Sequence, residues 1–278
     1  MNAKQQPADY AGMTARQIRE LCRIGSFDGP TAGVARGYAQ ANLVVLPSAW
    51  ATGFHRFCGL NTKPCPLLEV TEPGRYEPVK CAPGADVRTD LPRYRIYHDG
   101  MLTDGPTSIL HYWPDDDPPY PDLVAFLIGC SFTFESALID AGVPVRNIEE
   151  GRNVPMYRTN VACKPVGLFH GPMVVSMRPM TPQQAEIATR VTAAMPKVHG
   201  EPVHIGDPAA LGIKDLSKPD YGDAVTIREG EVPVFWACGV TPLEAILRAR
   251  PDIAIVHEPG HMLVTDLLDR DLREFGVR

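Results

Sequence analysis

The amino-acid sequence predicts an α/β protein, with a three-layer domain around a parallel sheet formed by both chain ends and an α+β domain inserted in the middle. Near both ends, short apolar runs alternate with segments that carry helix-start signals, which is the order typical of parallel sheets. In the middle, a hairpin signal is followed by a helix and further strands, an order typical of α+β domains. The predicted first domain covers residues 1–92 and 181–278, and the second covers 93–180.

The first domain is expected to open with a helix after a frayed tail over residues 1–12. Thr14 and Gln17 have the spacing of a capping box, in which each side chain satisfies a backbone N–H group of the other residue. Gly25 is the expected stop, because glycine adopts the left-handed conformation that ends many helices. The next predicted elements are a helix over 31–41, a strand over 43–46, a helix from Ser48 through Phe57 and a strand over 66–70.

The middle domain is expected to open with a β-hairpin. Side chains alternate in character from Arg93 to His98, and Asp99-Gly100 is a turn signal. The apolar stretch that starts at Asp122 favours a helix, interrupted at 129–131 and resumed over 132–141. Strands are predicted over 143–148, 156–161 and 173–177.

After residue 180 the chain returns to strands that alternate with capped helices. Thr181 and Thr241 are each followed by proline at the first helical position, and Gln184 and Glu244 complete two capping boxes. Asp207-Pro208 is a third helix start of this kind. The predicted strands beside these starts cover 203–205, 232–237 and 253–256. This βαβ order is the main reason to expect a parallel sheet.

The composition is that of a soluble globular protein, since 44% of the 278 residues are hydrophobic and 22% are charged. The formal charge of -6, with no run of Lys or Arg, argues against a nucleic-acid or anionic-membrane surface. An anionic substrate therefore needs a local basic pocket. A homo-oligomer is left open.

Two features predict a cytoplasmic protein. The seven cysteines are an odd set without C-x-x-C spacing, which favours reduced thiols over disulfides or a zinc ribbon. The N-terminus lacks the layout of a signal peptide, and the apolar run over 123–129 is too short to cross a bilayer. No nucleotide-binding motif occurs, so no cofactor is required, although a divalent metal is left open.

The stretch over 149–160 is the strongest candidate for substrate binding. Glycine and proline exclude a regular helix there, and forked guanidinium and amide groups are suited to holding a carboxylate. The predicted substrate-binding residues are Arg152, Asn153, Tyr157, Arg158 and Asn160, with Arg178 as a third arginine aimed at the same cleft. The alternative is a polar loop and an edge strand with solvated arginines.

His257 and His261 fit the H-E-x-x-H spacing of zinc proteases, but that assignment is rejected. The protease motif needs both histidines on one face of a continuous helix, and Pro259-Gly260 breaks such a helix. The segment instead predicts a turn after a strand. His257 and His261 remain candidates for a general base or metal ligands, against the alternative of turn histidines bonded to the backbone.

Cys238 and Asp207 are the other catalytic candidates. Cys238 ends a strand just before a helix start, where a thiol has a lowered pKa and free amides bind anions. Its alternative is a buried cysteine that acts as a small hydrophobe. Asp207 is expected to be an ordinary N-cap, or else a carboxylate that orients His204.

The run from Gly129 to Glu135 carries a thiol, two hydroxyls and a carboxylate between two predicted helical halves. It lacks the G-x-S-x-G spacing of a nucleophile elbow, so a serine hydrolase is not supported. A simple helix break is the favoured interpretation.

Several runs of sequence resemble one family when they are taken in order. They are PCPLLEVT, FLIGCSFTFE, EEGRNVPMYRTN, FHGPMVVSMRP, VHIGDPAALGI, GDAVTIREGEVPVFWACGVTP and HEPGHMLVTDL. The chain is similar, over about residues 14–267, to the bacterial hydro-lyase family related to vertebrate mitochondrial D-glutamate cyclase. The resemblance implies a two-domain α/β plus α+β protein that acts on a small carboxylate or amino acid. The cyclase relative closes glutamate to 5-oxoproline with loss of water.

The resemblance also implies a mechanism. Arg152 and Arg158 would hold the α-carboxylate, and His257 or His261 would take a proton from the amine. Backbone amides after Cys238 or Gly206 would stabilise the developing oxyanion, or a divalent metal on His257, His261 and Asp207 would polarise the γ-carboxyl. The alternative functions are dehydration of another hydroxy acid and non-catalytic binding of 5-oxoproline or a related carboxylate.

Overall fold

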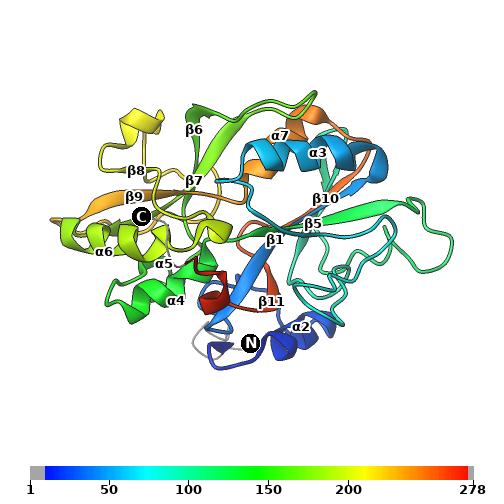
Figure 1. The fold of residues 1–278 in the computed structure, drawn as a ribbon, viewed down its shortest axis with the longest axis horizontal. Coiled ribbons are helices and arrows are strands. Elements are labelled where there is room, and N and C mark those ends of the chain that lie inside the picture. The colour runs from blue at the N-terminus through cyan, green and yellow to red at the C-terminus, as the bar shows by residue number, and fades with distance from the viewer. Residues whose placement is uncertain (1–9, 275–278) are drawn as a thin grey trace.

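The structure, a computed structural model, describes residues 10–274 and contains two antiparallel sheets that lie side by side (Figure 1). The first sheet has the order β2-β5-β1-β10-β3-β4, with β11 also paired to β1. Its strands are β1 (Tyr38–Pro47), β2 (Leu67–Val70), β3 (Tyr94–His98), β4 (Met101–Asp104), β5 (Leu123–Gly129), β10 (Ala254–His257) and β11 (Leu263–Leu268). The predicted parallel sheet is therefore wrong, because every pairing in this sheet is antiparallel.

The second sheet is smaller and has the order β6-β7-β9-β8, again antiparallel throughout. Its strands are β6 (Met156–Ala162), β7 (Pro172–Met180), β8 (His204–Ile205) and β9 (Val232–Ala237). The reason for the wrong prediction lies in helix α7 (Thr241–Ala249), which follows β9 and precedes β10. Because β9 and β10 belong to different sheets, α7 is not a crossover between neighbouring parallel strands.

Strand β1 organises the first sheet. One of its edges pairs with β5 from Ala41 to Pro47, and its other edge is divided between two strands. Val44 and Val45 pair with β10, whereas the half that starts at Tyr38 pairs with β11. The chain therefore leaves the middle of the sheet after β10, turns over 258–262, and re-enters as β11.

The helices cover the sheets and their junction (Figure 1). Helix α3 contacts β1 and β5, α7 contacts β7, α4 contacts β1 and α6, and α2 contacts β11. Their bounds are α2 (Ala15–Arg23), α3 (Ser48–Leu60), α4 (Phe132–Asp140), α5 (Arg146–Glu149) and α6 (Pro182–Ala193), with 3₁₀ turns at Pro196–Val198, Pro208–Leu211 and Asp269–Leu272. One buried apolar cluster includes Val44 of β1, Val175 of β7 and Phe235 of β9, so the two sheets share a core.

Three predictions of secondary structure are wrong. The segment from Leu123 to Gly129 is the strand β5 and not a helix, because it is buried along its whole length and so shows no alternation to mark it as a strand. Residues 31–37 form a loop before β1, so no helix covers 31–41. The predicted strand over 143–148 contains the short helix α5 instead.

Other predictions are confirmed. The capping boxes of Thr14 with Gln17 and of Thr181 with Gln184 are both present, at the starts of α2 and α6. The hairpin β3–β4 turns at Asp99 and Gly100, both of which have positive φ.

The strands of the predicted middle domain are divided between the two sheets. β3, β4 and β5, the last of which was predicted to be a helix, belong to the first sheet, and β6 and β7 belong to the second. The domain boundaries stay a prediction. Over residues 10–274 no helix has both the length and the apolar character that a bilayer crossing requires.

Candidate functional site

A buried ion pair joins helix α4 to strand β7 where the two sheets meet. Arg178 and Glu135 are 0% and 2% exposed, and the Arg178 guanidinium donates to Glu135 Oε1 from Nε at 3.0 Å and from a terminal nitrogen at 2.5 Å. Arg178 also donates to the hydroxyls of Ser131 and Ser176. A buried charged pair is stable only when its charges are well hydrogen-bonded, and all three nitrogens of the Arg178 guanidinium donate hydrogen bonds.

At the end of β5 the backbone packs closely against the segment at Lys197 before it reaches this pair. A Cβ atom on Gly129 would lie 2.0 Å from the carbonyl oxygen of Lys197, so only glycine fits there. Cys130 N–H then donates to Gln40 O of β1, and α4 begins after Ser131. The first turn of α4 thus directs Glu135 into the protein.

The second oxygen of Glu135 is held less tightly than the first. Oε2 and the side-chain amide atoms of the neighbouring Asn147 are buried without a hydrogen bond of standard geometry among residues 10–274. Burial raises the pKa of Glu135, although Arg178 and a weaker contact with the Asn147 amide oppose the shift. A buried carboxyl with a raised pKa is suited to carrying a proton.

The turn over 258–262 forms a second polar group at the split between β10 and β11. Thr31 N–H donates to Gly260 O, and the Thr31 hydroxyl accepts from Met262 N–H. Asn153 Nδ2 donates to Pro259 O, while a Cβ on Gly260 would lie 2.3 Å from Asn153 Oδ1. The segment is a turn and not a helix, as predicted from Pro259 and Gly260.

His257 at the end of β10 and His261 in the turn are both buried and neutral at pH 7. Burial lowers the pKa of His257 to about 4, although a contact of Nδ1 with the Leu43 backbone opposes the shift, and it also lowers the pKa of His261. His261 Nδ1 lies 3.2 Å from Pro259 O and donates to it, which leaves a lone pair on Nε2. His257 Nε2 is buried without a partner in the described chain.

Gln40 of β1 connects the turn to the ion pair. Its Nε2 donates to Thr31 O, and its backbone is bonded to Cys130 and to the Thr133 side chain in α4. Its Oε1 is another buried atom without a partner in residues 10–274, as is Asn153 Oδ1. Each such atom costs about 1–3 kcal/mol unless water or a ligand satisfies it. These atoms without partners make the junction the candidate site.

Cys238 lies at the same junction, but its thiol is not activated. Burial raises its pKa to about 11, which is opposite to the lowering expected at a helix start. The next residue, Gly239, packs directly on Asn42 of β1, because a Cβ there would lie 2.0 Å from Asn42 Nδ2. The thiol is therefore protonated at neutral pH.

The residues predicted to hold a carboxylate mostly bind the segment over 210–224 instead. Arg152 donates to Ala224 O and is half exposed, and Arg158 donates to Asp220, Glu244 and the Tyr221 hydroxyl. Tyr157 donates to Leu216 O, and Asn160 contacts Ala210 O at 3.5 Å. Arg152 and Arg158 therefore bind other parts of the chain and do not form a shared site for a carboxylate. Arg178, the third predicted arginine, is paired with Glu135.

Two predicted helix starts have different outcomes. Asp207 is an N-cap, because its side chain accepts from Ala209 N–H, and it lies at the exposed edge beside His204. The capping box at Thr241 is wrong: Val240 is the N-cap, and the Thr241 hydroxyl accepts from Val174 N–H of β7.

Glu244, the second residue of that predicted capping box, also points into the interior of the protein and is buried. It accepts hydrogen bonds from Arg158, Tyr221 and Arg248. No group of three or more His, Cys, Asp or Glu side chains within residues 10–274 is arranged to hold a metal ion.

Sequence reasoning did not single out Glu135, Asn147 or Gln40 as functional. One signal for Glu135 was available: it is an acidic residue in the apolar run FTFESALI, where the buried face of a helix should carry no charge without a partner. No local pattern marks Asn147 or Gln40, whose importance comes from burial.

Comparisons with known proteins agree on one family. The family model for D-glutamate cyclase matches residues 124–266, which span β5 to β11 and so include Glu135, Arg178 and the 258–262 turn. A "Putative hydro-lyase" of Stutzerimonas stutzeri is 57% identical over 263 residues, covering 95% of this chain and 97% of the relative. "Putative hydro-lyase YcsI" of Bacillus subtilis is 56% identical over 260 residues, covering 94% and 99%.

A solved structure, that of a nitrogen repressor-like protein from Methanococcus jannaschii, aligns with 90% of this chain and 97% of its own. Its TM-score is 0.37 and its sequence identity 11%, values at which the likeness supports no conclusion.

Proposed function

Because this chain belongs to the D-glutamate cyclase family and is a hydro-lyase, we propose that it converts D-glutamate to 5-oxo-D-proline with loss of water. The reaction centre in this proposal is the buried pair Glu135–Arg178. The observation that carries the proposal is the buried Glu135 carboxyl, whose pKa burial raises and whose Oε2 has no hydrogen bond of standard geometry among residues 10–274.

Ring closure makes three demands on the protein. The α-carboxylate must be held, the ammonium group must lose a proton, and the chain must be curled so that the nitrogen meets the γ-carboxyl carbon. A buried arginine meets the first demand, because its fork matches a carboxylate. A buried carboxylate with a raised pKa meets the second.

One proton transfer would prepare both groups. If the substrate ammonium gives a proton to Glu135, the nitrogen gains its attacking lone pair and Glu135 becomes neutral. Arg178 then loses its charged partner and can pair with the substrate α-carboxylate. The Arg178 guanidinium stays paired with one carboxylate before and after the transfer, which is the condition for holding its charge away from water.

The remaining steps also balance. The amine attacks the γ-carboxyl carbon, and the C–N bond forms as the C=O electrons move to oxygen. Protonated Glu135 gives its proton to one γ-oxygen, takes the second proton from nitrogen, and passes it to the same oxygen, which leaves as water. Glu135 returns to its ionised state, and the lactam keeps the α-carboxylate.

The neighbouring groups have supporting roles in this proposal. Of the two predicted oxyanion sites, Gly206 N–H already donates to Pro233 O and Thr241 N–H to Cys238 O, so we assign the oxyanion to the N–H of Gly239, which follows Cys238 just before α7. His261, with its Nε2 lone pair, is the second candidate base.

The test is proton NMR of the purified protein with D-glutamate, L-glutamate and both 5-oxoprolines. We expect interconversion of the D-enantiomers, and turnover that falls by about 100-fold or more in Glu135→Gln. The matched control is Glu231→Gln, because Glu231 is also buried against a buried arginine, Arg146, but has both oxygens bonded. This control should keep near-normal turnover.

The possible outcomes distinguish a wrong reaction from a wrong catalytic residue. Wild-type protein that converts none of the four compounds would rule out the cyclase activity. Turnover in Glu135→Gln equal to that of the control would reject Glu135 as the proton carrier and leave His261→Gln as the next variant. A loss of affinity for D-glutamate in Arg152→Ala and Arg158→Ala, but not in Arg178→Lys, would favour the clamp predicted from sequence.

A further inference from the structure

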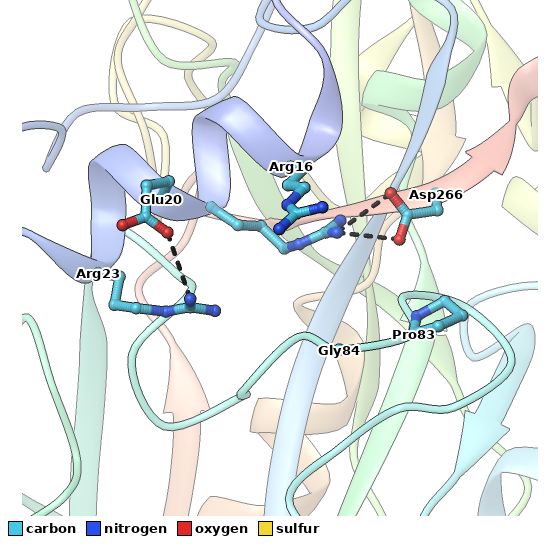
Figure 2. A pocket seen from close by; sticks show the side chains of 7 residues that line it. Arg16, Glu20, Arg23, Pro83, Gly84 and Asp266 are labelled. Carbon is cyan, nitrogen blue, oxygen red and sulfur yellow. Dashed lines mark hydrogen bonds and ion pairs between the residues drawn. The ribbon is translucent and has the colours of Figure 1, made fainter.

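A cavity of about 410 Å³ lies on the surface between helix α2, the loop at Pro83 and Gly84, and strand β11. Figure 2 shows the side chains that line it, with Arg16 and Arg23 reaching down from α2 and Asp266 on the opposite wall. Arginines occupy positions 16, 19 and 23, a spacing that places them on one face of the helix. Neither Glu135 nor Arg178 lines this cavity.

The three arginines differ in how their charge is used. Arg19 is buried and its guanidinium is already paired, since it donates to Val264 O and to both oxygens of Asp266. Arg23 is held by Asp90 through two bonds and reaches Glu20 only at 3.3 Å. Arg16 forms no hydrogen bond or ion pair with any residue between 10 and 274.

Arg16 is the group that is left for an anion. Two carboxylates, Glu20 and Asp266, line the cavity, and Asp90 holds Arg23 from beside it, so the three guanidinium groups are matched by three carboxylates, none of which pairs with Arg16. The Glu20 side chain is 57% exposed, and such an exposed ion pair contributes little, about 0–1 kcal/mol. An anion can therefore replace Glu20 on Arg23 at little cost while it also binds Arg16.

We propose that this cavity binds a small dianion, a dicarboxylate or a phosphate, with Arg16 as its anchor and Arg23 as its second contact. Guanidinium groups are the preferred partners of both anion types, because their forked donors match two oxygens. A volume of about 410 Å³ is within the usual range for small-molecule sites. The site does not depend on the proposed cyclase reaction.

Occupation of the cavity would also stabilise the contact between α2 and β11. Arg19 fastens α2 to β11 at Val264 and Asp266, and β11 begins directly after the 258–262 turn. A ligand that bridges Arg16 and Arg23 adds to this contact, and a ligand that binds only the folded state raises its stability.

The experiment is calorimetric titration of the full chain with inorganic phosphate and with succinate, at low ionic strength and against sodium chloride as the reference salt. We expect saturable binding of at least one dianion, weakened about tenfold or more in Arg16→Gln. The control is Arg190→Gln, because Arg190 is an exposed arginine of helix α6 that has no bonded partner among residues 10–274. Binding to this control should match the wild type.

A second variant distinguishes ligand binding from a structural role of the arginines. Glu20→Gln removes the carboxylate that competes for Arg23, so it should strengthen dianion binding severalfold. Phosphate binding without succinate binding, or the reverse, identifies the anion type. Equal affinity of wild type and Arg16→Gln, or a response no different from that to chloride, would overturn the proposal.

Discussion

Two buried ion pairs, Glu135–Arg178 and Glu231–Arg146, have the same chemical groups and different electrostatics. Burial raises the pKa of Glu135, which uses only one oxygen toward Arg178. Burial acts in the same direction on Glu231, but hydrogen bonds from Arg146 and the Arg228 N–H outweigh it and lower the pKa. Whether burial or hydrogen bonding prevails therefore separates a proton carrier from a structural charge.

At the residue scale, we predict that Cys238 reacts slowly with thiol reagents in the folded protein. Its pKa, raised to about 11 by burial, leaves almost no thiolate at pH 7.5, and only the thiolate is nucleophilic. Iodoacetamide labelling followed by peptide mass spectrometry measures the rate. The same labelling in about 6 M guanidinium, which unfolds most domains, supplies the reference rate. Rapid, selective labelling of native Cys238 would contradict the prediction.

At the element scale, glycine positions decide how closely strands and helices approach. Gly239, at the end of β9, touches the Asn42 side chain of β1, whereas Gly59 in the last turn of α3 has open space around the position of a Cβ. The first glycine is needed for packing between the two sheets, and the second is not.

We predict opposite effects of alanine at these two positions. Gly239→Ala should lower the free energy of unfolding by about 1–3 kcal/mol or more, because the new methyl group must displace a buried, bonded amide. Gly59→Ala should raise it by up to about 1 kcal/mol, since alanine favours the helical backbone. Urea unfolding at pH 7.5 measures both. If Gly239→Ala is as stable as the wild type, the close packing of β9 on β1 is wrong.

At the scale of the whole molecule, burial of neutral histidines makes stability depend on pH. Burial lowers the pKa of His199 and of His257 to about 4 in the folded protein, against an ordinary value of 6.5. The unfolded chain therefore binds more protons than the folded chain between about pH 6.5 and 4. The stability is complete above that window and is lost as the pH falls through it.

We expect each of the two histidines to cost about 2 kcal/mol of the free energy of unfolding when the pH is lowered from 7.5 to 5. Urea unfolding at the two pH values measures the sum. His199→Asn should reduce the loss by about 2 kcal/mol, and asparagine tolerates the positive φ of 83° at this position. An unchanged pH dependence in this variant would show that His199 is not the group that titrates.

The sequence by itself determined the features that depend on neighbouring residues. The capped starts of α2 and α6, the β3–β4 hairpin, the turn at Pro259 and Gly260 and the cap at Asp207 all follow from local chemistry, and all are present. The family was also recognisable from the order of its sequence runs.

Only the tertiary structure decided the pairing of strands and the composition of the candidate site. A buried run such as β5 carries no periodic signal, and α7 connects strands of two different sheets, so neither the strand nor its antiparallel partners could be deduced locally. Glu135 and Arg178 lie 43 residues apart, and the unpartnered atoms of Gln40 and Asn147 acquire meaning only through burial. Burial and long-range contact are properties of the folded chain, because they depend on which distant segments exclude water from each other.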